Sequence, residues 1–299
     1  MKAFANIKSR YAEYKALDSA DKVKAWKEGL INNAIYLLII IAVIYTYTQN
    51  SRFLSVASIV NIISLSAANI PIACGIAGTI VLTGTDLSAG RVVGLTACIS
   101  ASLLQSVTYA TKIFPDLPVL PIPLVILIVI VVGGIVGWVN GFFVAKFHLH
   151  PFIVTLAGMF FGRGMTSIIS TDMISIKNAT FMAWAKYKIY MPFGSYSKRG
   201  KFLPAYIYPT VIIAIIVLIV IIIVMKYTKF GRSVYAIGGN EQSALMMGLN
   251  VKRTKMAAYL LDGFLAGLGG FLFCMNSCAG FVEQAKGLEM DAISSAVIG

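Results

Sequence analysis

The stretch GRSVYAIGGNEQSALMMGLNVKRTK, residues Gly231–Lys255, separates two strongly apolar segments of the 299-residue chain. Asn240 is a favourable helix N-cap, Glu241 falls in the first helical turn, and Gly248 can adopt the left-handed conformation that ends a helix. The sequence therefore predicts a short, ordered helix from residue 241 to residue 247, in a polar loop between membrane segments.

This short helix is predicted to have an apolar face, formed by Leu245, Met246, Met247 and Leu249. Exposed methionines on an amphipathic helix are typical of a segment that inserts into a groove of another protein. A loop helix that lies on the bilayer surface fits the same residues. Both interpretations remain open from these residues alone.

The composition places the chain among the polytopic membrane proteins. Apolar residues make up 58% of the chain and charged residues 12%, and the mean hydropathy is +0.83. Soluble domains carry about a quarter charged residues. The first apolar run begins near Ile31, too late for a cleaved signal peptide, so we expect it to remain as an anchor. The predicted fold is an all-α transmembrane helix bundle at residues 31–299, after a cytoplasmic amphipathic segment at residues 1–30.

Windows of about 20 apolar residues predict about eight membrane spans. They cover residues 31–48, 59–83, 90–107, 122–145, 152–170, 206–225 and 256–275, and an eighth begins near residue 290. Asn69 and Pro71 lie inside the second span, which is therefore expected to be kinked and opened. Because the chain stops within the eighth apolar run, we expect C-terminal spans to be missing from it.

Basic residues in the loops predict the orientation of the chain. Residues 1–30 hold seven lysines and arginines and residues 226–255 hold six. Six predicted spans separate these segments, so both are assigned to the cytoplasmic face. Residues 173–204 are also basic, although this assignment places them outside the cell. We keep the assignment, because the even number of spans between the two cytoplasmic segments is stronger evidence than the charge of one loop. The net charge of +13 is attributed to topology and anionic lipid, and not to nucleic-acid binding.

No metal centre or enzyme site is predicted. The four cysteines include no C-x-x-C pair, and thiols in apolar helices usually act as small apolar fillers. His148 and His150 lack acidic or thiol neighbours in the sequence and are interpreted as interfacial residues. The chain has no phosphate-binding G-x-x-x-x-G-K-[ST], no H-E-x-x-H and no G-x-S-x-G. We therefore expect it not to be an enzyme.

Polar residues interrupt the membrane segments at Thr83–Arg91, TGTDLSAGR. A charge at the centre of a membrane helix costs ~3 kcal/mol, and such residues are tolerated where they line a wet cavity or are buried in protein. An ordinary solvated turn capped by Asp86 is the alternative. Asp86 and Arg91 are close enough in sequence to neutralise each other, and Arg163 with Asp262 is a second candidate ion pair.

Glycines recur at a spacing that allows helices to approach closely. Gly133, Gly137 and Gly141 form a tandem G-x-x-x-G pattern, and Gly263 and Gly267 repeat the spacing in a later span. Removing side chains from one face of a helix lets van der Waals packing drive association in lipid. These glycines predict tight helix packing and, taken alone, no further function.

Four ordered motifs resemble one transporter family. GGNEQSALMMGLNVKRTKMAAY (Gly238–Tyr259) resembles the cytoplasmic coupling loop of the bacterial ribose/galactose-type sugar permeases, which belong to ATP-binding-cassette importers of the second carbohydrate-uptake class. VLTGTDLSAGRVVGLTA (Val81–Ala97), PFIVTLAGMFFGRGM (Pro151–Met165) and EMDAISSAVIG (Glu289–Gly299) resemble its other motifs. The resemblance covers residues 55–299, and the second motif is most similar to the galactose/methyl-galactoside branch.

The resemblance implies a multi-pass permease subunit in the bacterial inner membrane, with its N-terminus cytoplasmic. Two permease copies would form one pathway, with ATP-binding subunits below that hold ATP and Mg²⁺ and an extracytoplasmic sugar-binding protein above. The basic loop at residues 173–204 departs from the family and puts docking of the binding protein there in doubt. The residues expected to couple to the ATPase are Gly239, Asn240, Glu241, Gln242, Ser243, Ala244, Leu245, Met246, Met247 and Gly248. The pore-lining candidates are Asn69, Asp86, Ser88 and Asn140.

Two alternatives to a galactose importer remain. A permease of the same family could carry another sugar, a nucleoside or a furanosyl compound. A stand-alone secondary carrier, coupled to an ion through Asp86 or Asp262, would need no ATPase. The predicted docking helix favours an ATPase-driven permease over the carrier.

Overall fold

The computed structural model describes residues 19–50, 53–107, 109–196 and 202–298. The chain divides into two compact units, Met1–Ile59 and Val60–Gly299. Part of the amphipathic segment predicted near the N-terminus lies outside the described residues, including Tyr11, Tyr14 and Leu17.

The first unit contains helices α2 (Ser19–Asn32) and α3 (Ala34–Gln49). The 16 residues of α3 are almost entirely apolar, and none of them is buried by the other described residues of this unit. The hydroxyl of Thr46 donates to the backbone carbonyl of Ala42 at 2.7 Å. Polar groups that are satisfied inside the helix suit an apolar surrounding, because lipid offers no hydrogen-bond partners.

Helices α4 (Val56–Ser66) and α5 (Asn69–Val81) form a bent pair, with an angle of 53° at the break between them. Pro71 lies in the first turn of α5, where a missing backbone N–H costs no intrahelical hydrogen bond. The kink predicted at Asn69 and Pro71 is therefore confirmed, and it separates the predicted second span into two helices.

Four described helices are long and apolar enough to cross a membrane, or five spans if the bent α4–α5 pair counts as one. The four are α7 (Ile122–Phe147), α8 (Pro151–Ile169), α10 (Pro209–Tyr227) and α13 (Val251–Ser277). Helix α3 and helix α6 (Ala89–Leu103) are apolar but shorter. The prediction of about eight spans is not confirmed. The difference arises from helix length, because α3 has 16 residues and α6 has 15, fewer than the about 20 that cross the apolar core of a bilayer.

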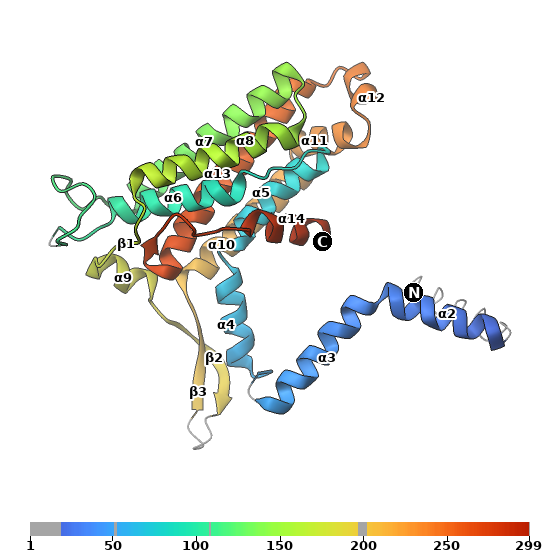
Figure 1. Cartoon of the computed structure of the whole chain (residues 1–299), viewed down its shortest axis with the longest axis horizontal. Helices are drawn as coiled ribbons and strands as arrows, with labels where there is room; N and C mark the ends of the chain where they lie inside the picture. Colours follow the sequence, from blue (N-terminus) through green and yellow to red (C-terminus); the bar gives the residue numbers. More distant parts are fainter. Residues whose placement is uncertain (1–18, 51–52, 108, 197–201, 299) are drawn as a thin grey trace. The chain divides into compact units, whose positions relative to one another are not determined.

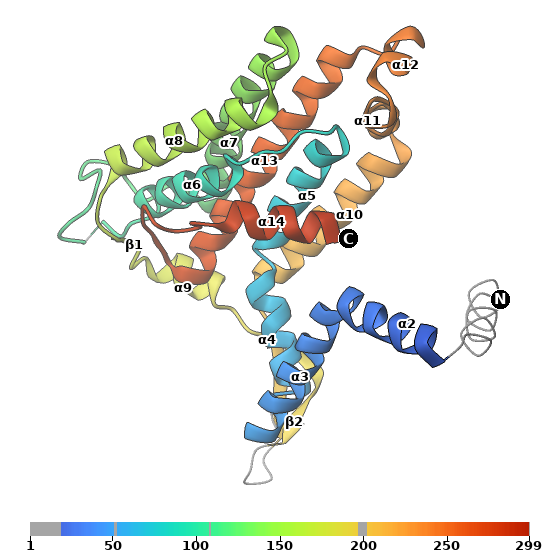
Figure 2. The same cartoon turned by 45° about the vertical axis from the view of Figure 1, so that its right-hand side comes forward.

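Helix α13 lies at the centre of the second unit and packs along α7, α6 and α5; Figures 1 and 2 show it between α7 and α5. Gly133 and Gly137 on α7 meet Gly263 and Gly267 on α13, and a Cβ at any of these positions would run into the facing backbone. The close helix packing predicted from the glycine spacing is confirmed.

Two further parts of the second unit lie at opposite ends of this bundle. Helix α9 (Ala179–Ala185) and the antiparallel hairpin of β2 (Ile189–Tyr196) and β3 (Phe202–Ile207) lie at one end, and α12 (Glu241–Met246) lies at the other (Figure 1). The other elements are β1 (Ile174–Ser175), which pairs with β4 (Ala279–Gly280), α11 (Lys229–Gly239) and α14 (Leu288–Ile298). The fold is thus mainly helical, with two small sheets that the all-α prediction did not include.

Replacing Gly137 with valine should separate α7 from α13, because the new side chain would meet the backbone of Tyr259 and Gly263. Overpacking of this kind costs about 1–3 kcal/mol, so the thermal unfolding temperature in mild detergent should fall by several degrees. Gly164→Val on α8 is the matched control, since open space surrounds that position. Equal effects of the two substitutions would contradict the glycine contact.

Candidate functional site

The first candidate site is the short helix α12 and the turns that bound it. The side-chain oxygen of Asn240 accepts a hydrogen bond from the backbone N–H of Ser243 at 2.8 Å, as an N-cap does. Gly248 has a φ of +80°, the left-handed conformation that glycine adopts most readily. The predicted helix, its cap and its stop are confirmed, and the helix ends one residue earlier than predicted.

Helix α12 is fixed to the bundle on one side. Ala244 is fully buried in an apolar cluster that includes Leu82, Val234 and Val251, from the end of α5, from α11 and from α13. The Nζ of Lys255, on the second turn of α13, lies 2.7 Å from a carboxylate oxygen of Glu241. An exposed ion pair contributes little stability, but here it gives α12 a defined orientation relative to α13.

The opposite side of α12 is apolar and exposed. Met246 is 91% exposed, and Met247 and Leu245 are 69% and 62% exposed. Contiguous exposed apolar side chains on a helix that is held in place are typical of an interaction surface. We call Leu245, Met246 and Met247 the α12 tip.

Three of the four predicted pore-lining residues form a hydrogen-bonded chain. A carboxylate oxygen of Asp86 accepts from the backbone N–H of Ser88 at 2.7 Å and from its hydroxyl at 2.6 Å. The side-chain amide of Asn140, on α7, donates to the Ser88 hydroxyl at 2.8 Å. The chain therefore connects the loop before α6 to α7. Asn69 lies apart from it at the far end of α5, which is about 18 Å long at 1.5 Å per residue.

These three side chains are buried inside the protein, with exposed fractions of 2% for Asp86, 1% for Ser88 and 3% for Asn140. Asp86 does cap a turn, as one alternative predicted, but that turn is not solvated. Asn140 also borders a pocket of about 460 Å³ that is lined mainly by apolar residues of α7 and α8. The polar stretch is therefore tolerated here because protein covers it.

Two buried polar residues of α13 were not among the predicted pore-lining residues. Tyr259 and Asp262 are 1% and 0% exposed. The hydroxyl of Tyr259 lies against Gly84, in the loop before α6, and a carboxylate oxygen of Asp262 lies against Gly75 of α5. Their spacing of three residues puts them on one face of a helix. That spacing could have indicated a shared buried face, but only tertiary packing shows which elements cover it.

Both predicted ion pairs are wrong. The guanidinium of Arg163 pairs with Glu283 at 3.4 Å, on the surface, and not with the buried Asp262. Arg91 donates to the backbone carbonyl of Val282 at 3.3 Å, and not to Asp86. The pairing of Arg91 with Asp86 was predicted from their proximity in the sequence. In the structure the guanidinium of Arg91 is directed instead at the loop after α13. A hydrogen bond from Lys286 lowers the pKa of Glu283 below its usual range.

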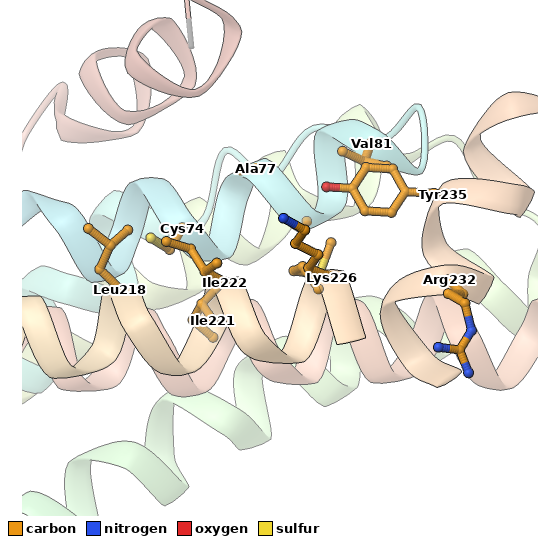
Figure 3. Close-up of a pocket in the computed structure, with 11 residues that line it drawn as sticks. Cys74, Ala77, Val81, Leu218, Ile221, Ile222, Lys226, Arg232 and Tyr235 are labelled. Carbon is orange, nitrogen blue, oxygen red and sulfur yellow. The ribbon is translucent and has the colours of Figure 1, made fainter. Parts of the chain in front are cut away.

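A lateral pocket of about 690 Å³ lies between α5, α10 and α11 (Figure 3). Its walls are apolar side chains such as Leu218 and Ile222, and its polar groups include Lys226 and Tyr235. In Figure 3 the guanidinium of Arg232 points away from the other labelled side chains. Such walls suit an amphiphile better than a solute with many hydroxyl groups, which needs several hydrogen-bond partners.

Within the described part of the chain, no group of three or more histidine, cysteine, aspartate or glutamate side chains could hold a metal ion. His148 and His150 instead border a pocket of about 330 Å³ beside α12, together with Glu241, Lys255 and Tyr259.

Comparisons with known proteins agree with these features. The family described as branched-chain amino acid transport system / permease component matches residues 51–299. The galactose/methyl galactoside import permease protein MglC of Salmonella typhimurium is 35% identical over 285 residues, which cover 94% of this chain and 82% of the relative. The ribose import permease protein RbsC of Haemophilus influenzae is 32% identical over 270 residues, which cover 90% of this chain and 77% of the relative. No solved structure matches the chain.

The two sides of α12 should differ in chemical accessibility. In a variant whose four native cysteines are replaced, a cysteine at Met246 should react with a water-soluble maleimide at once. A cysteine at Ala244 should react at least about tenfold more slowly, because modification must wait for local opening. Mass spectrometry of timed samples measures both rates, and equal rates would mean that α12 is not seated on the bundle.

Proposed function

The chain belongs to the family of permease components of branched-chain amino acid transport systems, and from this premise we propose that it is the membrane-spanning permease subunit of an ATP-driven sugar importer. The relatives named galactose/methyl galactoside import permease are 34–35% identical to it, against 28–32% for those named ribose import permease. This difference favours galactose, methyl galactoside or a related monosaccharide as the substrate.

The α12 tip is the observation that supports coupling to an ATPase. It offers exposed apolar side chains, and its other side is anchored through Ala244 and through the Glu241–Lys255 ion pair. A separate ATP-binding subunit, which would hold ATP and Mg²⁺, receives the tip in a cleft. Movement of that cleft would move α12. Because Glu241 of α12 pairs with Lys255 of α13, the movement would then reach α13, the central helix. Docking that differs between two states of the ATPase then shifts the permease between two states.

The same proposal fixes the orientation. Helix α12 and the N-terminus are cytoplasmic, so α9 and the β2–β3 hairpin, at the other end of the second unit, face an extracytoplasmic sugar-binding protein. A second copy of the chain completes the pathway in the lipid bilayer. The short apolar helices α3 and α6, together with α14, are proposed as the further membrane segments that would bring the count toward eight.

The sugar pathway is proposed to include Asn140, which borders an existing pocket. Asp86 and Ser88 are buried, so a sugar reaches them only when α7 and α8 move away from the loop before α6. Asn69, at the far end of α5, would belong to a different level of the pathway.

Substitution of the α12 tip tests the coupling. In Met246→Asp, a charge replaces an apolar anchor, and losing such an anchor costs about 2 kcal/mol or more of binding. At 1.4 kcal/mol per tenfold, this means a roughly thirtyfold weaker association with the ATP-binding subunit. The measurement is co-purification of that subunit in mild detergent, followed by uptake of labelled galactose in cells.

Met173→Asp is the matched control, because Met173 is also exposed, at 61%, in the loop after α8. It should leave co-purification of the ATP-binding subunit unchanged, because it lies at the opposite end of the second unit from α12. If Met246→Asp keeps uptake, and uptake instead collapses when the ion gradient is dissipated, the chain is a secondary carrier and the importer proposal fails.

A further inference from the structure

The lateral pocket between α5, α10 and α11 is an apolar groove in the side of the second unit (Figure 3). Its α10 wall consists of large apolar side chains, from Leu218, Ile221, Ile222 and Met225. Its α5 wall includes the small residues Cys74, Ala77 and Gly78. A Cβ at Gly78 would meet no atom within 4 Å, and Ile222 is 50% exposed. The groove, of about 690 Å³, therefore opens to the surroundings of the bundle.

Basic residues lie at one end of this groove. Lys226, near the end of α10, and Arg232, on α11, border the pocket together with Tyr235. Eight positions of α10 separate Leu218 from Lys226, so the apolar part extends about 12 Å from the basic end. Residues 224–239 contain three basic residues and no aspartate or glutamate. The groove is thus apolar along its length and positively charged at one end.

The positive charge at this end has no acidic partner among the described residues, whose ion pairs involve other basic side chains. The guanidinium of Arg232 donates to the backbone carbonyl of Tyr227 at 3.3 Å. The Nζ of Lys226 lies 5.5 Å from the centre of the Tyr227 ring. In Figure 3 the amino group of Lys226 points from α10 toward α5, and the hydroxyl of Tyr235 is turned to the same part of the groove. Lys226 and Tyr235 are therefore the groups that a ligand in the groove can reach.

These features select among the occupants of a groove in a membrane domain. A sugar needs several hydrogen-bond partners, which the apolar walls do not offer. A lipid without net charge would fill the walls but leave the charge of Lys226 uncompensated. An anionic phospholipid satisfies both parts, because its acyl chain is apolar and its phosphate carries the opposite charge. Basic pockets between membrane helices bind anionic headgroups in this way.

We propose that the groove binds one anionic phospholipid, with an acyl chain along α5 and α10 and with the phosphate against Lys226 and Tyr235. The basic end is the end of α10 that leads to α11 and α12 (Figure 2). The headgroup therefore lies in the inner leaflet, an assignment that rests on the orientation given under the proposed function. The cytoplasmic leaflet is the one in which anionic lipid attracts basic residues near the membrane surface.

A lipid at this place supports the helix on which α12 is seated. Val234 and Ile237 of α11 belong to the same apolar cluster as Ala244 of α12. Arg232 and Tyr235, on the same helix, border the groove. The lipid therefore contacts α10 and α11 together and limits their separation, and it acts through α11 on the position of α12.

Native mass spectrometry of the full chain tests the site. The chain is purified in a neutral detergent and incubated with phosphatidylglycerol, which is anionic, or with phosphatidylcholine, which has no net charge. Wild type should retain phosphatidylglycerol about fivefold better, the contribution of one lysine near a membrane surface. Lys226→Gln should lose most of this preference. Lys252→Gln is the matched control, because it removes the same charge from an exposed lysine that does not border the groove, and it should keep the preference.

Thermal unfolding tests the apolar part of the site. Because a ligand stabilises the folded state that binds it, phosphatidylglycerol should raise the unfolding temperature of wild type by several degrees. Gly78→Leu fills the groove from a position with open space and should abolish this increase. Gly164→Leu on α8, where open space also surrounds the glycine, should keep it. Glycerol 3-phosphate, the headgroup without acyl chains, should have no such effect.

Four results would overturn the proposal. They are equal retention of the two lipids by wild type, equal losses in Lys226→Gln and Lys252→Gln, an undiminished effect of phosphatidylglycerol on Gly78→Leu, and an equal effect of glycerol 3-phosphate. A dimer that Gly78→Leu converts to a monomer, with lipid retention unchanged, would show that a second copy of the chain covers the groove instead. These measurements need neither the ATP-binding subunit nor a sugar, so their outcome is separate from that of the importer proposal.

Discussion

The direct backbone contact between α7 and α13 is the constraint on which the second unit depends. Glycines on both helices remove the side chains that would hold the two apart, so the helices meet along several turns. With α13 held against α7, its other faces pack on α5 and α6. Tyr259 is thereby directed at Gly84 in the loop before α6, and Asp262 at Gly75 of α5. The glycine contact thus determines both the centre of the bundle and the residues that meet inside it.

The two candidate sites lie on the same helix at different depths. Helix α12 is attached to the first turns of α13 through Lys255, and the buried side chains of Tyr259 and Asp262 lie further along α13. A displacement applied at the end of a hydrogen-bonded helix reaches its middle with little loss, because the packed interior resists compression. The surface proposed for a partner and these buried residues are therefore connected through one continuous helix, to which α12 is joined by the Glu241–Lys255 ion pair and by the chain itself.

Local features of the fold could be predicted from the sequence, because they depend on neighbours within a few residues. The cap at Asn240, the left-handed Gly248 and the break beside Pro71 are of this kind. The glycine spacing also predicted close packing correctly, although it could not say which helix was the partner. The number of spans could not be predicted, because a hydropathy window does not show where a helix breaks or ends, as at the bend between α4 and α5 and at the end of α6 at Leu103.

The candidate site shows the same division. The bond between Asp86 and Ser88 spans two residues, and a turn capped by Asp86 was foreseen as an alternative. The sequence suggested Arg163 as the partner of Asp262, but Arg163 pairs with Glu283 on the surface, and Asp262 is buried against Gly75 of α5. The surroundings of a buried acid depend on helices that are distant in the sequence, so charge complementarity alone is a weak guide to its neighbours.

Helix α3 has a consequence for how the chain is made. None of its side chains is buried by the other described residues of its own unit, so this unit gives the helix no apolar contacts that lipid could not provide. Its apolar surface and internally satisfied backbone are stable in lipid by themselves. During synthesis such a helix can enter the bilayer before any other described apolar helix has left the ribosome. Helix α13, by contrast, finds its place only after the glycines of α7 are available, so the order of the segments along the chain suits the order in which they can become stable.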